Sequence, residues 1–434
     1  MSFSWTKYSP LESDASLQDP LAFDYFAQVL GNIVLPAFTT RTSRARYYGA
    51  VCYGIYISHR HLENSGMPIT EDGIMQTFAL YEKYWARAIA GWYIKDRGGI
   101  FERDGNENGL RGKRGAIRAA NNNNLTTLGE DFKLLSRQLE LGGFGAYRSS
   151  LEYLELVDQF LHLTHNGKKL AEAFADEHFD RLVLAAIKSQ SIREKEGQAT
   201  INSFGWNSRL DAFIQEVNFH VEERALLRKL VMDHPKVSTS AALIQQYYTD
   251  GNTMTMIENI ASHTPRSDFE REIVQSYKTM EIFEKLCVSI NKVWCSMIET
   301  AMNKLNVITP MEATAECGDM IDALLESGLI RDLMRSPSYM NLSGSFHGSS
   351  LEIFLRQHVD AEHRDSFVID LARYHIDIMK RRRSGSWIQL DGSNILVLTG
   401  FDYPQKTKNA KYLHDYKTGN VLSLIEDTEW NANA

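Results

Sequence analysis

The sequence predicts a mainly α-helical protein. Apolar residues recur at three- and four-residue spacing along most of the chain, and alternating β-type patterns are confined to short runs. With 28 Gly and 9 Pro in 434 residues, the composition argues against a collagenous or low-complexity chain. We therefore expect a multi-helical fold with a central winged-helix-like segment and a small β-hairpin near the C-terminus.

The first predicted domain, residues 1–125, contains three helices. Apolar periodicity and N-cap residues place them at residues 21–35, at residues 44–61 with Thr42 or Ser43 as the cap, and at residues 70–94. A loop at residues 95–124 follows, with six glycines and four consecutive asparagines. A loop this long inside a compact domain is usually functional or disordered.

The second predicted domain, residues 126–180, has the element order of a winged helix-turn-helix. Its expected elements are a helix at 129–140, a turn at 142–145, a helix at 147–154, β-like runs at 156–157 and 161–163, and a helix capped by Thr164 at 165–180. In this hypothesis the β-like pair is the wing. The helix at 147–154 then takes the place of the helix that reads DNA.

Long helices dominate the third predicted domain, residues 181–383. The expected helices are 208–234, 268–305, 320–333 and 351–383. The tail, residues 384–434, contains a β-hairpin at 387–398 with its turn at 391–394, and a last helix near 420–427.

Charge and cysteine content restrict the class of protein. The formal net charge is −8, so nucleic-acid binding requires a local concentration of cations. The four cysteines form no CxxC pair, and we expect four reduced, buried thiols. The N-terminus has no cationic start followed by an apolar core, and no apolar stretch is long enough to span a bilayer. We therefore expect a cytoplasmic protein without a membrane partner.

Catalytic motifs are largely missing from the sequence. There is no Walker loop, GxSxG elbow or HExxH motif, and the glycine-dense residues 142–145 follow a helix rather than a strand. His358, Glu362 and His363 are expected in one helix, where His358 and Glu362 share a face and His363 points elsewhere. A solvated helix face is favoured over the alternative of a metal site, and His414-Asp415 has no companion acids. We predict no catalytic residue, no metal site and no cofactor.

Two basic clusters are the strongest functional signal. Residues 109–124 contain four cations and no acid, and the interleaved glycines allow close approach to a phosphate. The alternative for this segment is a solvated loop. A second cluster stands at a helix start, where it forms an anion site or, alternatively, pairs with acids and serves packing. The predicted DNA-binding residues of the two clusters are Arg41, Arg44, Arg46, Arg111, Lys113, Arg114 and Arg118.

The predicted reading helix adds one more candidate. Arg148 can reach a guanine, and Tyr147, Ser149, Ser150 and Glu152 are expected to share its exposed face. Nearby acids oppose DNA binding. The alternative is a helix that contacts a protein or serves as scaffold.

Several segments resemble a known group of proteins. Residues 19–24 (DPLAFD) and 35–48 (LPAFTTRTSRARYY) resemble the opening of helical proteins encoded in bacterial anti-phage defence gene clusters. The segment from Tyr147 to Thr164 and the hairpin that begins at Trp387 resemble the same group. The resemblance covers about a quarter of the chain. It implies a helical protein that works beside an ATPase, such as an SMC-like ATPase, or a nuclease of the same operon.

The sequence thus leads to one hypothesis and two alternatives. The hypothesis is a non-catalytic subunit of a defence complex that contacts the backbone of double-stranded DNA and a partner protein. The first alternative is a metal-dependent nuclease with dispersed acids, for which Glu130, Asp131 and Lys133 supply the residue types. The second is a scaffold that binds only proteins, which the acidic net charge favours.

Overall fold

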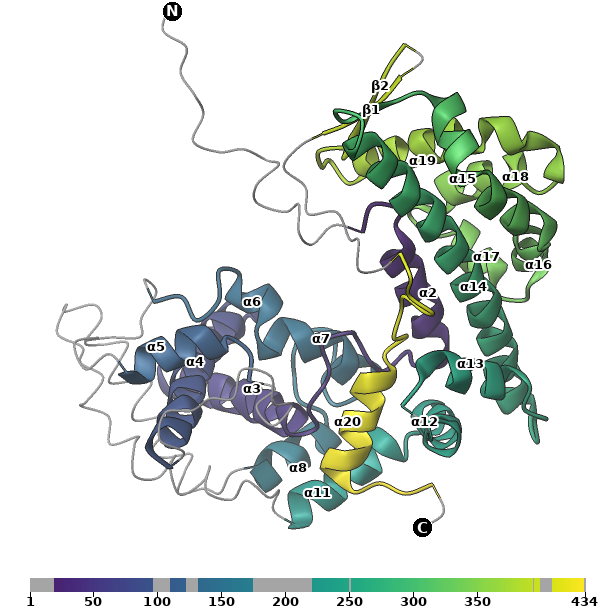
Figure 1. The fold of residues 1–434 in the computed structure, drawn as a ribbon. Helices are drawn as coiled ribbons and strands as arrows, with labels where there is room; N and C mark the ends of the chain where they lie inside the picture. Colours follow the sequence, from purple (N-terminus) through teal and green to yellow (C-terminus); the bar gives the residue numbers. More distant parts are fainter. Residues whose placement is uncertain are drawn as a thin grey trace, which may run out of the picture. The chain divides into compact units, whose positions relative to one another are not determined.

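The chain folds into two compact units, each assembled from separate stretches of sequence (Figure 1). The computed structural model describes residues 19–96, 110–121, 132–174, 221–249, 251–392, 394–398 and 408–432. One unit comprises residues 35–242 and 419–434, and we call it the α3 unit. The other comprises residues 1–34 and 243–418, and we call it the α14 unit.

The described part of the α3 unit is helical. Its elements are α3 (Arg46–Asn64), α4 (Glu71–Asp96), α5 (Lys113–Asn121), α6 (Gln138–Leu141), α7 (Gly143–Tyr153), α8 (His165–Phe174), α11 (Val221–Leu227), a π-helical turn (Arg228–Met232) and α20 (Thr418–Thr428). Helix α12 (Pro235–Tyr247) contains the boundary between the units.

Helix α3 is the centre of the α3 unit and packs against α4, α7, α8 and α11. Its buried aromatic residues fix these contacts. Tyr47 stacks on Tyr147 of α7 with ring centroids 5.2 Å apart and meets Trp85 of α4 edge-on. Gly54 lets α4 approach closely, because a Cβ there would lie 2.5 Å from the ring of Phe78. Large buried rings of this kind supply most of the hydrophobic stabilisation of a helical core.

The α14 unit is built around one long helix. Its elements are α2 (Phe23–Val34), α13 (Thr253–Ala261), α14 (Asp268–Met302), β1 (Val307–Ile308), α15 (Pro310–Glu326), α16 (Leu329–Arg335), α17 (Tyr339–Ser343), α18 (Gly348–Gln357), a 3₁₀ turn (Ala361–Ser366), α19 (Phe367–Arg381), β2 (Ile388–Asp391) and β3 (Asn394–Val397). Helix α14 contacts α2, α13, α15, α16 and α19, and it buries Trp294 and Phe283. Helix α14 is therefore the core element of this unit.

Side-chain caps define where the helices of this unit begin. Ser267 accepts a hydrogen bond from the Glu270 amide at the start of α14. Thr309 and Glu312 form a capping box at the start of α15, with Pro310 in the first turn. A cap of this kind stabilises a helix by about 1 kcal/mol.

The predicted β-hairpin is confirmed, and a third strand extends it. Strands β2 and β3 are antiparallel, with Ile388 opposite Val397, and Gly392 takes the left-handed conformation of the turn (φ +60°). Strand β1 pairs with the other edge of β3, with Val307 opposite Leu396. A two-residue strand leaves too short a pattern to be recognised in the sequence.

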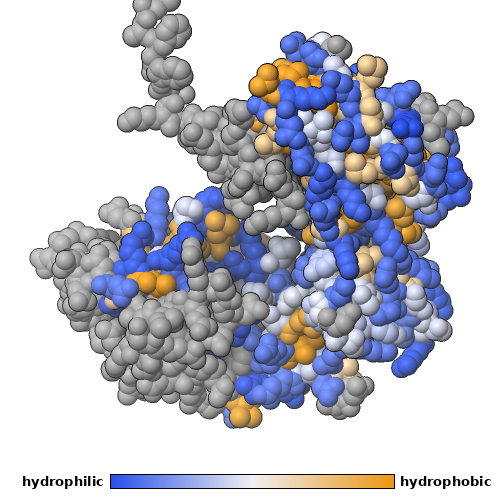
Figure 2. Space-filling view, in the orientation of Figure 1, coloured by the Kyte–Doolittle hydropathy of each residue, from blue (hydrophilic) through white to orange (hydrophobic). Residues whose placement is uncertain are grey.

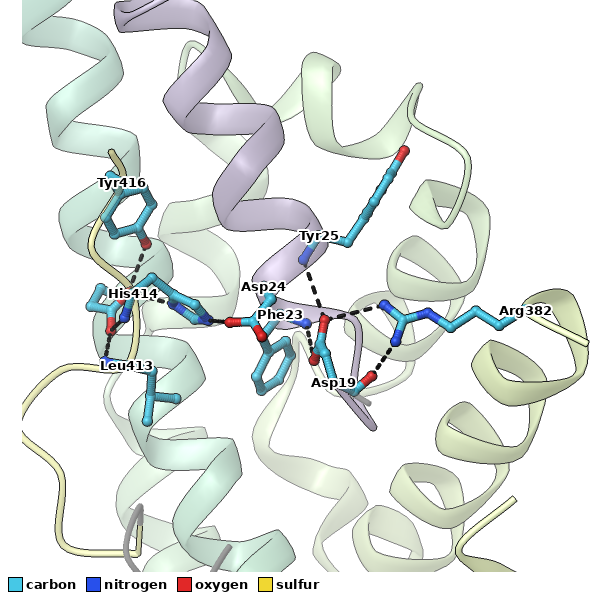
Figure 3. A network of polar contacts seen from close by, with 9 residues as sticks. Asp19, Phe23, Asp24, Tyr25, Arg382, Leu413, His414 and Tyr416 are labelled. Carbon is cyan, nitrogen blue, oxygen red and sulfur yellow. Dashed lines mark hydrogen bonds and ion pairs between the residues drawn. The ribbon is translucent and has the colours of Figure 1, made fainter. Parts of the chain in front are cut away.

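A buried carboxylate anchors the end of the α14 unit to its central helix (Figure 3). Glu284 of α14 accepts hydrogen bonds from the amides of Leu413 and His414, from His414 Nδ1 at 2.7 Å and from the Tyr416 hydroxyl at 2.7 Å. Burial raises the pKa of Glu284, but the hydrogen bonds and charge of His414 outweigh burial and hold that pKa below its usual value. Burial lowers the pKa of His414, but the hydrogen bond and charge of Glu284, with the charges of Asp24 and Asp19, outweigh burial and raise it. The two groups therefore form an imidazolium–carboxylate pair.

The N-terminal end of α2 is held in a similar way (Figure 3). The carboxylate of Asp19 accepts hydrogen bonds from the amides of Phe23 and Tyr25, and it pairs with Arg382 at 3.2 Å. The carbonyl of Asp19 also accepts from Arg382. These contacts join α2, near the start of the chain, to the residues that follow α19.

Several predicted helices are confirmed, and others need correction. Helices at 21–35, 44–61, 70–94 and 268–305 correspond to α2, α3, α4 and α14. The single helix predicted at 351–383 is wrong, because the chain breaks at His358 and forms α18, a 3₁₀ turn and α19. The helix predicted at 320–333 is also wrong, since Gly328 adopts φ +73° and separates α15 from α16.

The surface is mostly hydrophilic where it is described. Hydrophilic residues cover most of the visible described face, and hydrophobic residues reach it at a few places (Figure 2). Leu305 and Met311, on either side of β1, are 92% and 80% exposed. Within the described ranges, no helix combines the length and the apolar character that crossing a bilayer requires.

We expect Glu284→Gln to destabilise the protein by about 3 kcal/mol, because the imidazolium of His414 would then be buried without its carboxylate. Thermal unfolding followed by circular dichroism measures the change. Glu281→Gln is the matched control, since Glu281 lies on the same helix in a partly exposed pair with Lys285. Equal melting temperatures for the two variants would contradict the anchoring role of Glu284.

Candidate nucleic-acid interface

The eight predicted DNA-binding residues all lie in the α3 unit, and three of them are paired with carboxylates. Arg44 pairs with Asp427 of α20 at 2.9 Å. Arg46 lies 3.7 Å from the buried Glu223.

Arg148 bridges Glu71 at 2.5 Å and Glu152 at 2.9 Å. Arg44, Arg46 and Arg148 therefore serve packing rather than anion binding, because a nearby carboxylate offsets the charge of each.

Arg41 and Arg111 are held by neutral acceptors instead. The guanidinium of Arg41 donates to the carbonyl of Glu140 at 3.1 Å, and Arg41 is exposed. The guanidinium of Arg111 donates to the carbonyl of Leu141 at 3.3 Å and to the carbonyl of Arg41. Carbonyl oxygens orient a guanidinium without neutralising it, so neither arginine is matched by a directly paired carboxylate.

The predicted loop at 95–124 is partly a helix. Residues 97–109 and 122–131 lie outside the described residues, but 113–121 form α5. Lys113 and Arg114 occupy the first turn of α5, where no acid is present. Cations are unfavourable beside the positive end of a helix, by about 0.3–1 kcal/mol each, and a bound anion would relieve that repulsion.

The segment of residues 132–134 packs directly on α5. Gly115 has no room for a side chain, since a Cβ there would lie 2.4 Å from the carbonyl of Leu134. Arg118 covers the ring of Phe132 and donates to the carbonyl of Lys133 at 3.1 Å. Lys133 is therefore held beside the cations of α5.

These residues form what we call the basic surface. It consists of Arg41, Arg111, Lys113, Arg114, Arg118, Lys133 and Arg137. Its described acid is Glu140, which pairs with Arg137 at 3.0 Å. The sequence assigns no binding role to Lys133 or Arg137. Lys133 is brought to α5 by the packing of residues 132–134 on Gly115 and Arg118. Arg137 is brought to Arg41 through Glu140, which pairs with Arg137 and whose carbonyl accepts from Arg41.

The predicted reading helix does not present the expected face. Tyr147 and Ser150 of α7 are buried, and Arg148 is engaged by carboxylates. Ser150 bonds to Tyr48, and the Tyr147 hydroxyl bonds to the backbone of Arg44, so both residues serve packing. The expectation of a shared exposed face is therefore wrong for these two residues.

Other elements of the predicted winged helix are shorter than expected. Of the helix predicted at 129–140, the structure describes residues 132–140, and the helix found there is the four-residue α6. The β-like runs meet in a single antiparallel bridge, Val157 to Leu163. Thr164 does cap α8, because its hydroxyl accepts from the Gly167 amide. The winged helix itself stays a prediction.

The glycine-dense motif at 142–145 starts α7 rather than forming a turn before a helix. The buried carboxylate of Glu82 occupies the space at this helix N-terminus and accepts a hydrogen bond from the Gly143 amide. A Cβ on Gly143 would lie 2.9 Å from the ring of Tyr47 and 3.0 Å from the Glu82 carboxylate. The helix N-terminus is thus filled from within the protein.

Histidine and acid groups elsewhere serve structure. His358 is buried beside Asp370 at 3.5 Å, so its predicted position on a solvated helix face is wrong. The two ring nitrogens of His414 face Glu284 and Asp24, which leaves neither for a metal ion. Across the part of the chain that is described, no group of three or more His, Cys, Asp or Glu residues is arranged to hold a metal ion.

Comparisons with protein-family models, curated proteins and solved structures find no match to this chain.

We expect Gly143→Ala to destabilise the α3 unit by about 1–3 kcal/mol, because the added methyl group meets the Tyr47 ring and the Glu82 carboxylate. Denaturant unfolding measures the loss. Ser149→Ala, at an exposed position of the same helix, is the control and should change stability by less than about 0.5 kcal/mol. A stability loss no larger than that of the control would show that Gly143 is free to carry a side chain.

Proposed function

We propose that the protein is a non-catalytic, cytoplasmic subunit that contacts the phosphate backbone of double-stranded DNA through the basic surface of its α3 unit. The observation that supports this most directly is how the cations are held. Arg41 and Arg111 are oriented by carbonyl oxygens, whereas Arg44, Arg46 and Arg148 are matched to carboxylates. Only the first arrangement leaves charge available for an anion.

The composition of the basic surface favours backbone contact over base reading. Its members are Lys and Arg side chains, and Lys113 and Arg114 add their charge to the positive end of α5. Arg114 and Arg118 are one helical turn apart, about 6 Å along the axis, and both are exposed. Such cations neutralise phosphates along a strand without distinguishing sequence.

Contact with a protein partner is the second part of the proposal. Leu305 and Met311 are largely exposed beside β1, and Leu305 and Asn306 both take left-handed backbone conformations (φ +57° and +66°). An exposed apolar side chain on a strained loop, beside another in the first turn of α15, is typical of a contact surface. The resemblance to proteins of anti-phage defence clusters favours an ATPase, such as an SMC-like ATPase, or a nuclease as that partner.

We expect Arg111/Lys113/Arg114→Ala to lower the affinity for duplex DNA about tenfold or more near 0.1 M salt and to flatten the salt dependence, because fewer counterions are released. Fluorescence anisotropy with a labelled duplex, measured across a salt series, tests this. Arg148→Gln is the control. It removes one arginine charge, against three cations in the triple variant, from a residue already bound to Glu71 and Glu152, so it should change affinity by much less than a third of the effect.

Unchanged affinity in the triple variant would exclude the basic surface as the DNA site. Cleavage of the duplex in the presence of Mg²⁺ or Mn²⁺, abolished by one carboxylate substitution, would support a metal-dependent nuclease instead. No binding by the wild-type protein at low salt would support a scaffold that binds only proteins.

A further inference from the structure

Glu82 is a buried acid at the junction between α6 and α7. It lies on α4, is 2% exposed, and accepts hydrogen bonds from the Gly143 amide and from Gln138 Nε2 at 3.1 Å. Gly142 and Gly143 allow this approach, since a Cβ at Gly142 would lie 2.6 Å from the carboxylate. The junction thus closes tightly around one carboxylate.

The same stretch of backbone holds the arginines of the basic surface. Residues 140–143 bind Glu82 through the Gly143 amide, and they bind Arg41 and Arg111 through the carbonyls of Glu140 and Leu141. Glu82 and the two guanidinium groups therefore share one four-residue stretch of backbone, and the charge of Arg111 acts on Glu82 directly. Inside a protein, charges interact with little screening by salt.

We propose that Glu82 is the buried counter-charge of the basic surface and makes its contact with phosphate depend on pH. Ionised Glu82 lowers the positive potential at Arg111, which weakens phosphate binding. Neutral Glu82 leaves that potential undiminished. The inference rests on the proposed function, because it concerns the regulation of the same surface.

The environment of Glu82 sets the pH range of this effect. Burial raises the pKa of Glu82 to about 7, against the hydrogen bonds from Gly143 and Gln138 and the charge of Arg111, which lower it. The groups that face Glu82 are Tyr47 on α3, Tyr81 on α4, Arg111 before α5, Gln138 on α6 and the Gly143 amide on α7. Both tyrosines stay neutral at this pH, because burial raises their pKa values far above it.

Phosphate binding and protonation of Glu82 must then favour each other. A bound phosphate adds a negative charge near the carboxylate, so it raises the pKa of Glu82. By linkage, the complex takes up protons near pH 7, and affinity rises as pH falls from 8 to 6. A single charge near the phosphate changes affinity by about twofold or more, depending on its distance and the local dielectric constant.

The chain supplies a matched control in Glu223. This residue is also buried in the α3 unit, and burial raises its pKa to about 7 as well. Its cationic neighbour is Arg46 rather than Arg111. Glu223→Gln therefore removes the same charge over the same pH range, but away from the α6–α7 junction.

The experiment measures duplex-DNA affinity of the full chain at pH 6, 7 and 8 for the wild type, Glu82→Gln and Glu223→Gln. We expect wild-type affinity to fall at least about twofold from pH 6 to 8. Glu82→Gln should keep the tighter, low-pH affinity at pH 8. Glu223→Gln should keep the wild-type fall in affinity from pH 6 to 8, whatever its absolute affinity, because Glu82 still titrates there. Calorimetry of wild-type binding in buffers of different ionisation enthalpy counts the protons taken up when the complex forms. This measurement needs no variant, so it tests the proposal even if Glu82→Gln fails to fold.

Two results would overturn the role of Glu82 while leaving DNA binding intact. One is a Glu82→Gln variant that keeps the pH dependence of the wild type. The other is wild-type binding at pH 7 without proton uptake. Absence of wild-type binding at every pH would instead overturn the proposed function, and this inference with it.

Discussion

The contact between the Glu82 carboxylate and the N-terminus of α7 is the constraint on which the basic surface depends. It fixes the backbone at residues 140–143, and that backbone supplies the carbonyls that orient Arg41 and Arg111. An ionised carboxylate is costly to bury unless several donors surround it. Here an amide, a side-chain amide and the charge of Arg111 together partly offset that cost.

The α14 unit uses the same physical device for a different purpose. Glu284, buried on α14, accepts four hydrogen bonds from residues 413–416. These bonds fix residues 413–416 against the central helix of the unit. The environments differ in one respect. Glu284 faces a protonated histidine, which holds its pKa low, whereas burial dominates at Glu82 and raises its pKa. Of these two acids, Glu82 is therefore the one that changes charge near neutral pH.

Carboxylate pairing separates structural arginines from those available to a ligand. Arg41, Arg44 and Arg46 lie within six residues of one another, and the sequence gives no reason to treat them differently. In the structure, Asp427 and Glu223 come from distant segments to meet Arg44 and Arg46. The Arg41 guanidinium meets a carbonyl, that of Glu140, rather than a carboxylate among the contacts described for it. One basic motif thus contains both structural arginines and an arginine available to a ligand, and the acceptor that each guanidinium meets, carboxylate or carbonyl, separates them.

By itself, the sequence determined the helical class, the limits of α2, α3, α4 and α14, and the C-terminal hairpin. These features follow from local periodicity, caps and turn residues, which act over a few neighbouring positions. It also located the cations of residues 111–118. Tertiary structure alone decided that α2 joins residues 243–418 and that α20 joins residues 35–242. It also decided that a carboxylate fills the glycine-rich helix start and that Lys133 lies beside α5, because these contacts join residues far apart in the chain.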